Sequence, residues 1–189
     1  MSKVQFGISN AYYAVRNSDG TYAAPVHMPG AQNLAISNSG SDSNIVYADN
    51  MNFWSKSTKS GRSGDLQMTK FPESFYIDVL GQEKDPATGM LYESPNDNAK
   101  EFALLFQLET DLGGKRVVWY RCTATTPTYT AATATESITE ASESSTITAA
   151  AATFGTGVNA VTKTQGVCET NDAAYNTFFS AVVVPTPGA

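Results

Sequence analysis

The chain has few residues suited to metal or covalent chemistry: two cysteines and one histidine in 189 residues. Cys122 and Cys168 form no C-x-x-C pair, and two cysteines are too few for a disulfide framework, so we expect buried free thiols. His27 lies beside a Met-Pro-Gly turn, and no G-x-S-x-G motif accompanies it. We therefore predict that His27 is a packing or turn residue and that the chain has no catalytic base or metal site.

Nucleotide-binding motifs and an excess of positive charge are also missing. Neither G-x-x-x-x-G-K-[ST] nor G-x-G-x-x-G occurs, and 12 Lys and Arg face 18 Asp and Glu, for a net charge of −6. Binding DNA through its phosphates needs clustered cations, and the nearest approach is Lys56, Lys59 and Arg62 in a polar segment. We therefore predict that the chain is not an enzyme, needs no cofactor and does not bind nucleic acid tightly.

Long apolar runs are absent as well. No stretch of about 18 apolar residues could span a bilayer, and residues 1–15 hold no apolar signal-peptide core, so we expect no membrane association. The 41% hydrophobic content is typical of a folded chain, and 189 residues are most simply one domain. Only 16% of residues are charged, which is compatible with a surface covered by other subunits.

What the chain does contain is a β pattern. Every second residue from 102 to 108 is a large apolar one, namely Phe102, Leu104, Phe106 and Leu108. This alternation predicts a strand with one buried face. A Gly113-Gly114 turn and a second apolar strand over 115–125 complete a hairpin. Further strands are predicted at 3–8, 12–16, 31–37, 45–48, 52–57 and 65–70.

One helix is predicted over about 72–80. Pro72 suits a first turn, Glu73 suits the positive N-terminal end, and Gly81 ends the helix after an apolar stripe of Phe75, Val79 and Leu80. Residues 82–99 are polar and predict an excursion around a short segment at 90–93. Residues 173–181 indicate a short helix or the start of a final strand that ends at 182–184.

Between Thr123 and Thr153 the sequence is dominated by Ser, Thr and Ala. Glu136, Glu140 and Glu143 fall at helical spacing, but Thr-rich segments favour extended structure and no apolar stripe opposes the acids. We therefore predict solvated strand positions for these acids, rather than a helix or the paired carboxylates of a glycosidase.

Several short motifs occur in a specific order along the chain: Phe6-Gly7-Ile8, Tyr47-Ala-Asp-Asn50, Ser63-Gly-Asp-Leu66, Phe71–Gly81, Phe102–Phe106 and Trp119–Ala124. From about Val4 to Val184 this order resembles the major tail protein, or tail tube protein, of long non-contractile-tailed bacteriophages of the phi13 type. The resemblance implies a mainly β fold, a β-sandwich or barrel with one flanking helix, and a long strand, turn and strand in the Ser/Thr/Ala-rich region with Ile138 and Ile147 pointing inward.

The resemblance also implies a structural virion protein that is assembled in the bacterial cytoplasm. Hexameric rings would stack into a tube for DNA ejection, with the tape measure, tail initiator or baseplate, and tail terminator proteins as partners. The 1–189 domain would carry an assembly hairpin at about 37–64 that docks Met51, Phe53 and Trp54 into a neighbour. The alternative is that this hairpin completes the subunit's own core.

A tube wall should let DNA pass without binding it, so we expect acidic and small polar side chains in the lumen, with Asp49 and Asp65 as the candidates. A second hypothesis is a monomeric β-sandwich that binds carbohydrate through aromatic residues such as Tyr12, Tyr13, Phe53 and Trp54. Self-association distinguishes the two hypotheses.

Overall fold

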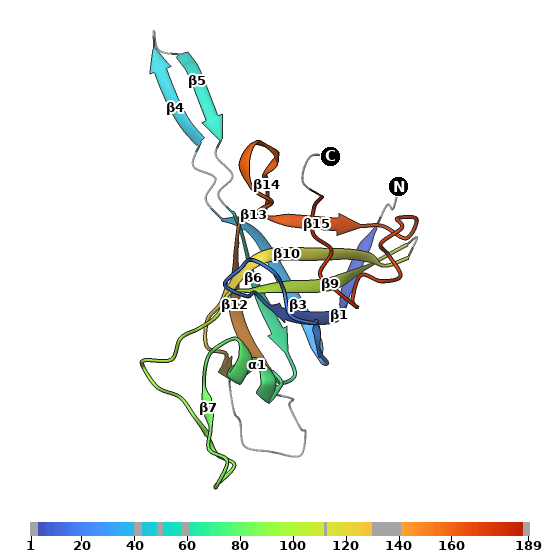
Figure 1. Ribbon diagram of the computed structural model, residues 1–189. Helices are drawn as coiled ribbons and strands as arrows, with labels where there is room; N and C mark the ends of the chain where they lie inside the picture. Colours follow the sequence, from blue (N-terminus) through green and yellow to red (C-terminus); the bar gives the residue numbers. More distant parts are fainter. Residues whose placement is uncertain are drawn as a thin grey trace, which may run out of the picture.

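The computed structural model describes residues 4–39, 43–48, 51–57, 61–111, 113–129 and 141–186, and only the backbone of 43–48 and 51–57. Figure 1 shows a mainly β structure with one short helix. The strands are β1 (Gln5–Val15), β2 (Val26–Met28), β3 (Ala31–Ser39), β4 (Ser43–Ala48), β5 (Met51–Ser57), β6 (Gly61–Met68), β7 (Glu83–Lys84), β8 (Leu91–Tyr92), β9 (Phe102–Thr110), β10 (Lys115–Ala124), β11 (Thr128–Tyr129), β12 (Glu143–Ala150), β13 (Ala152–Phe154), β14 (Val161–Lys163) and β15 (Gln165–Cys168); the helices are α1 (Glu73–Asp78) and a 3-10 turn (Gly157–Asn159).

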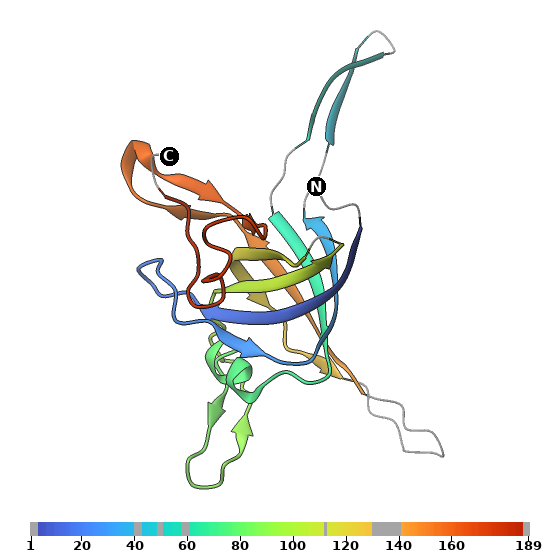
Figure 2. The same cartoon turned by 90° about the vertical axis from the view of Figure 1, so that its right-hand side faces the viewer.

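The main sheet runs in the order β2-β1-β9-β10-β12-β6-β3, and every pairing in it is antiparallel. Strand β10 bends the sheet, because its first part, from Arg116 to Trp119, pairs with β15 and its last part, from Arg121 to Ala124, pairs with β12. A register shift against β9 lies between these two parts. The result is two layers that share β10, as Figure 2 shows.

The predicted β9–β10 hairpin and the predicted helix are confirmed. Pro72 is the N-cap residue of α1, and the helix is two residues shorter at its C-terminal end than predicted. Gly81 follows with a φ of +79°, and a Cβ atom at this position would lie 2.6 Å from the carbonyl oxygen of Asn98. Only glycine fits this conformation and this close approach, so the chain turns here.

The two strands predicted at 3–8 and 12–16 are one strand, β1. Gly7 and Asn10 have positive φ values of 69° and 51°, and the register against β9 shifts beside both residues. The turn-prone residues that suggested a break therefore form bulges, because pairing with β9 continues on either side of them.

Two predictions about burial and local structure are wrong. Residues Phe102–Phe106 are buried on both faces of β9, not on one. Residues 173–181 form successive turns, and 182–184 are not in a strand. The two corrections have one cause: the C-terminal segment lies over the outer face of β9 and β10 and buries Ala103, Leu105 and Val118 there.

The C-terminal segment is held by specific contacts. The Arg116 guanidinium lies 3.7 Å above the Tyr175 ring centroid and donates a hydrogen bond to the Tyr175 carbonyl oxygen. The Tyr175 hydroxyl donates to the Gly114 carbonyl oxygen at 2.8 Å, and the Tyr120 hydroxyl donates to that of Val183 at 3.0 Å. These contacts fix the segment without regular secondary structure.

The larger core lies between the two layers and beneath α1. Trp119 stacks edge-on against Phe106, and Phe75 of α1 packs edge-on against Tyr13 and Phe102. Ile147 points into this core, as predicted, whereas Ile138 lies outside the described residues. Cys122 and Cys168 are buried and free, as expected, in separate clusters.

Alkaline pH should destabilise this fold. Burial raises the pKa of Tyr13, Tyr22, Tyr76 and Tyr120 from 10.0 to about 12. Between pH 10 and about 12 the unfolded chain loses these protons while the folded chain retains them, so the free energy of unfolding falls as pH rises. Urea denaturation across this window should show a falling midpoint, with a shallower fall for Tyr13→Phe. Equal slopes for wild type and variant would contradict the assignment.

Candidate assembly surfaces

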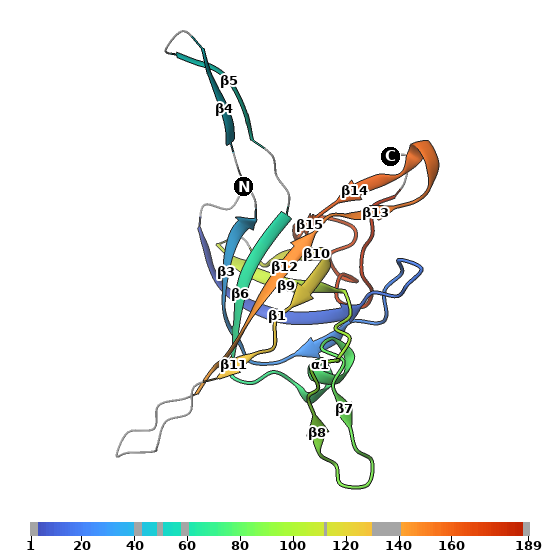
Figure 3. The same cartoon turned by 90° about the vertical axis from the view of Figure 1, so that its left-hand side faces the viewer.

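The β4–β5 hairpin extends away from the rest of the subunit. The two strands pair with each other from Ser43↔Ser57 to Ala48↔Met51 and form a two-stranded sheet of their own. Figures 1 and 3 show them projecting beyond the ends of β3 and β6. Met51, Phe53 and Trp54 all lie on β5, so the backbone carries these three apolar residues out of the body of the molecule.

Strands β3, β6 and β12 lie side by side (Figure 3), and their registers place mainly polar residues on one outer face. Their inward positions hold Leu34, Leu66 and Ile147, which pack in the larger core. Because side chains alternate between the faces of a strand, the residues between them point outward. The cross-strand rows on this face are Asn33–Gln67–Ser144, Ala35–Asp65–Thr146 and Ser37–Ser63–Thr148.

We call these nine residues the polar face. Asp65 is its one charged residue, and Asp65 is exposed. The Thr146 hydroxyl donates a hydrogen bond to Asp65 Oδ1 at 2.6 Å, and the Ser37 hydroxyl donates to the Ser63 carbonyl oxygen at 3.4 Å. The surface is hydrophilic and has no cation with which to hold a phosphate, so nucleic acid would find little to bind here.

The polar face ends at a free strand edge. Among the described strands, β3 pairs only with β6 and ends the order of the main sheet. Strand β1 comes close to β3 across a corner, but the two strands do not pair, and the sheet is not closed. The backbone groups on the outer edge of β3 are therefore available to a strand from another chain.

The residues predicted to act in assembly fall in three places. Met51, Phe53 and Trp54 are on the projecting hairpin, Asp65 is in the middle of the polar face, and Asp49 lies outside the described residues. The structure brings Asp65 together with Thr146, which is 81 positions away in the sequence. The other members of the polar face were not predicted individually; the period-two Ser/Thr spacing of 144–148 is the signal that could have found them.

Of the three candidate acids in the Ser/Thr/Ala-rich region, the structure describes one. Glu136 and Glu140 lie outside the described residues, whereas Glu143 starts β12. Glu143 Oε2 accepts hydrogen bonds from the Phe71 backbone N–H at 2.7 Å and from the Tyr76 hydroxyl at 3.2 Å. Glu143 thus holds α1 and the segment before it against the sheet, which is a structural role rather than the solvated position we predicted.

Within the described ranges, no group of three or more His, Cys, Asp or Glu residues could hold a metal ion. His27, on β2, packs its ring 4.7 Å from that of Tyr12, in keeping with the predicted packing role. No helix in the same part of the chain is long and apolar enough to cross a membrane.

A model of the phage tail tube protein family matches residues 8–182 of the chain. The chain belongs to the phage tail tube protein family. No curated protein matches it. The tail tube subunit is therefore a structural component of the phage virion, and the mainly β fold agrees with the predicted resemblance.

Proposed function

We propose that the subunit polymerises as stacked hexameric rings and that the rings form the conduit through which viral DNA passes into the bacterial host. The polar face carries this proposal. It is a three-stranded, charge-poor surface backed by the hydrophobic core, and it ends at the free edge of β3. Six such sheets joined edge to edge would close into a barrel with a hydrophilic lumen and no exposed edges.

The charge of the subunit supports passage without binding. Each chain carries −6, so a ring of six chains carries six times −6, or −36. Like charges repel over a Debye length of about 8–10 Å, and the lumen surface proposed here presents Asp65, Ala35 and neutral hydroxyl and amide groups. DNA would therefore slide past the polar face rather than adhere to it.

The β4–β5 hairpin supports contact between subunits. Its strands pair with each other and project from the body, which favours an intermolecular role over completion of the subunit's own core. We propose that Met51, Phe53 and Trp54 supply apolar area to this contact, since aromatic anchors commonly dominate interface energetics. Asp49 stays a candidate for the lumen.

A tube of this kind needs other tail proteins at its ends and inside it during assembly. We propose the tape measure protein, the initiator or baseplate complex and the terminator protein as partners, and a single domain spanning 1–189. The family match favours this function over a monomeric carbohydrate-binding module.

Negative-stain electron microscopy of the purified subunit, at rising concentration and on addition of a tail initiator complex, tests the proposal. Hollow tubes or six-fold rings with a central channel are the expected result. Compact monomers at every concentration, with no assembly on the initiator, would refute it and would make a glycan-binding assay the next step.

A further inference from the structure

Phe6 is an exposed aromatic residue near the start of β1. Its side chain is 58% exposed, and that of the nearby Val4 is 57% exposed. In the described sheets this end of β1 pairs only with β9, where Phe6 is opposite Glu109. The Asp111 N–H also donates a hydrogen bond to the Val4 carbonyl oxygen at 3.3 Å. An aromatic side chain that an ordered strand holds in water is typical of a residue that contacts another protein.

A hollow of about 690 Å³ lies elsewhere on the subunit. Three segments enclose it: the loop after β1 at 19–24, the end of β13 and the turn after it at 153–156, and the C-terminal stretch at 180–185. The apolar part of its lining comes from Tyr22, Ala24, Phe154, Val182, Val184 and Pro185. A hollow of this size can accept an aromatic side chain together with its neighbours.

The walls of the hollow are already fixed in the free subunit. The Tyr22 hydroxyl donates to the Tyr120 carbonyl oxygen at 2.8 Å, and the Tyr120 hydroxyl donates to that of Val183 at 3.0 Å. The loop after β1 is closed by Asp19, whose carboxylate accepts hydrogen bonds from the backbone N–H and the hydroxyl of Thr21. A preformed site binds with little loss of conformational entropy, so an occupant of complementary shape needs few contacts.

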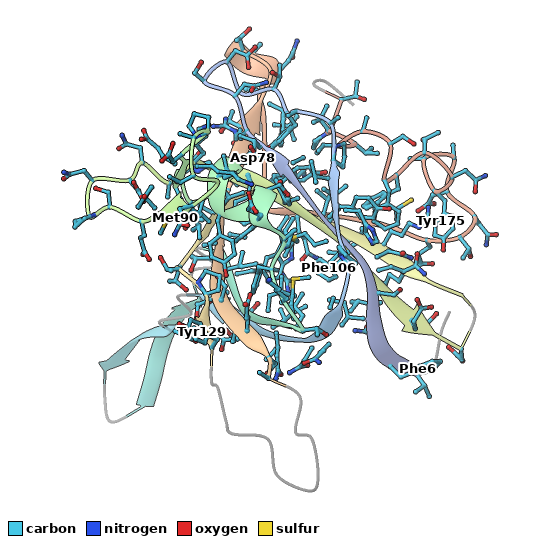
Figure 4. All side chains as sticks on the ribbon, turned by 90° about the horizontal axis from the view of Figure 1, so that it is seen from below. Phe6, Asp78, Met90, Phe106, Tyr129 and Tyr175 are labelled. Atoms are coloured by element: carbon cyan, nitrogen blue, oxygen red, sulfur yellow. The ribbon has the colours of Figure 1, made fainter. Side chains whose placement is uncertain are left out.

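Phe6 and the hollow lie on opposite flanks of the polar face. Figures 2 and 3 show the start of β1 on one side of the molecule, together with β3, and the loop after β1 on the other side. Figure 4, from below, shows Phe6 on the side away from that loop. If the polar face lines a lumen, these flanks are where neighbouring copies in a ring meet.

The charges of the two flanks are complementary. Beside Phe6, residues 107–115 contain two acids and one base, for a net charge of −1. Beside the hollow lie three bases, Arg16, Lys100 and Arg121, and two acids, Asp19 and Glu101, for a net charge of +1. Glu101 forms ion pairs with Arg16 at 3.0 Å and with Arg121 at 3.2 Å, so one carboxylate faces two guanidinium groups. Opposite charges on two surfaces favour their correct pairing.

We propose that the hollow of one copy receives Phe6 of the neighbouring copy in the same ring, with Glu109 of that neighbour beside the Arg16–Glu101–Arg121 cluster. This inference rests on the proposed function and names the contact between neighbours within a ring. The two patches differ, so every copy offers one of each. A contact between different patches forms a closed ring when its rotation closes, and patches on opposite flanks of a lumen-facing wall meet this condition.

A crosslinking experiment tests this pairing in the full-length chain. The double variant Phe6→Cys/Val184→Cys changes two exposed residues and is assembled into tubes, then treated with a short bismaleimide. Each ring closes on itself, so denaturing gels should show a ladder from dimer to hexamer that ends at six. A mixture of the two single variants should stop at dimers. The wild type, whose Cys122 and Cys168 are buried, should stay monomeric.

The matched control is Phe6→Cys/Met90→Cys, because Met90 is 56% exposed and lies outside the hollow. Tubes without a ladder, equal crosslinking through position 90, or a ladder that continues past six would overturn the assignment and leave the tube intact. If the first double variant does not assemble, Val4→Cys/Ala24→Cys uses neighbouring positions, and the same outcomes decide. A wild-type chain that forms no tubes on an initiator refutes the proposed function itself.

If neither double variant assembles, single substitutions decide. Phe6→Ser should raise the subunit concentration needed for tubes at least about tenfold, since an aromatic anchor at an interface contributes on the order of 2 kcal/mol. Met90→Ser removes a similarly exposed apolar side chain and should leave that concentration unchanged. Light scattering measures both values, and equal values for the two variants would overturn the proposal.

Discussion

Replacing Phe53 and Trp54 together by Ser should leave a folded subunit that no longer assembles. Both residues are on a hairpin whose strands pair only with each other in the described sheets, so the fold of the body does not depend on them. Two aromatic anchors at an interface contribute on the order of 2 kcal/mol each or more. Their loss should weaken each subunit contact by about 4 kcal/mol, or roughly a thousandfold in the association constant.

Circular dichroism and thermal denaturation measure the fold of this variant, and electron microscopy with light scattering measures its assembly. The expected result is a native spectrum with no tubes under conditions where the wild type forms them. The control is Val158→Ser/Val167→Ser, which removes two exposed apolar side chains elsewhere and should assemble normally. Loss of the folded monomer in Phe53→Ser/Trp54→Ser would show that the hairpin completes the subunit's own core, which was the alternative.

The second large effect concerns the polar face. Asp65→Lys/Thr146→Lys should give tubes that hold DNA instead of letting it pass. The change adds two charges at Asp65 and one at Thr146, so a ring of six subunits would gain six times three, or +18. Lysines that neutralise phosphates release counterions, which gives nonspecific binding with a Kd of about 10⁻⁴–10⁻⁶ M per site at physiological salt. Repeated along a tube, such contacts should stall ejection and strongly reduce infectivity.

Cosedimentation of DNA fragments with assembled tubes at increasing salt measures this effect directly, and plaque assays measure its consequence. The matched control is Thr156→Lys/Glu169→Lys, which makes the same charge change at exposed positions away from the polar face. Both variants should fold and assemble, since single substitutions at exposed positions usually alter stability by about 0.5 kcal/mol or less. Equal retention of DNA and equal infectivity for the two variants would show that the polar face does not line the lumen.

Local features of the chain were predictable because their causes are local. The β9–β10 hairpin follows from alternating apolar residues and a glycine pair, and α1 follows from Pro72, Glu73 and a glycine that takes positive φ after the helix. The order of short motifs pointed to the family, and the family model confirms it over residues 8–182. Each of these signals lies within about 20 residues or in the linear order of segments, so no knowledge of packing was needed.

Predictions failed where distant segments meet. The alternating pattern predicted that Ala103 and Leu105 lie on the outer, unburied face of β9. The C-terminal segment, some 70 positions away in the sequence, covers them. The same segment was predicted as a helix or strand, yet it is held instead by Arg116, Tyr120 and Tyr175 side chains. Glu143 was predicted as a solvated acid and is instead a bridge to Phe71 and Tyr76, because β12 begins beside α1.

The sequence by itself determined that this protein is mainly β, acidic and poor in chemically reactive side chains, and that it belongs with tail tube proteins. Only the tertiary structure decided which surfaces are available for assembly. The polar face exists because the registers of β3, β6 and β12 align residues from three distant segments in the same rows. A groove lined by Pro29, Tyr76 and Leu91 forms where the turn before β3, helix α1 and β8 meet. Strand register and the packing of remote segments depend on the whole core at once, which is why local sequence patterns do not encode them.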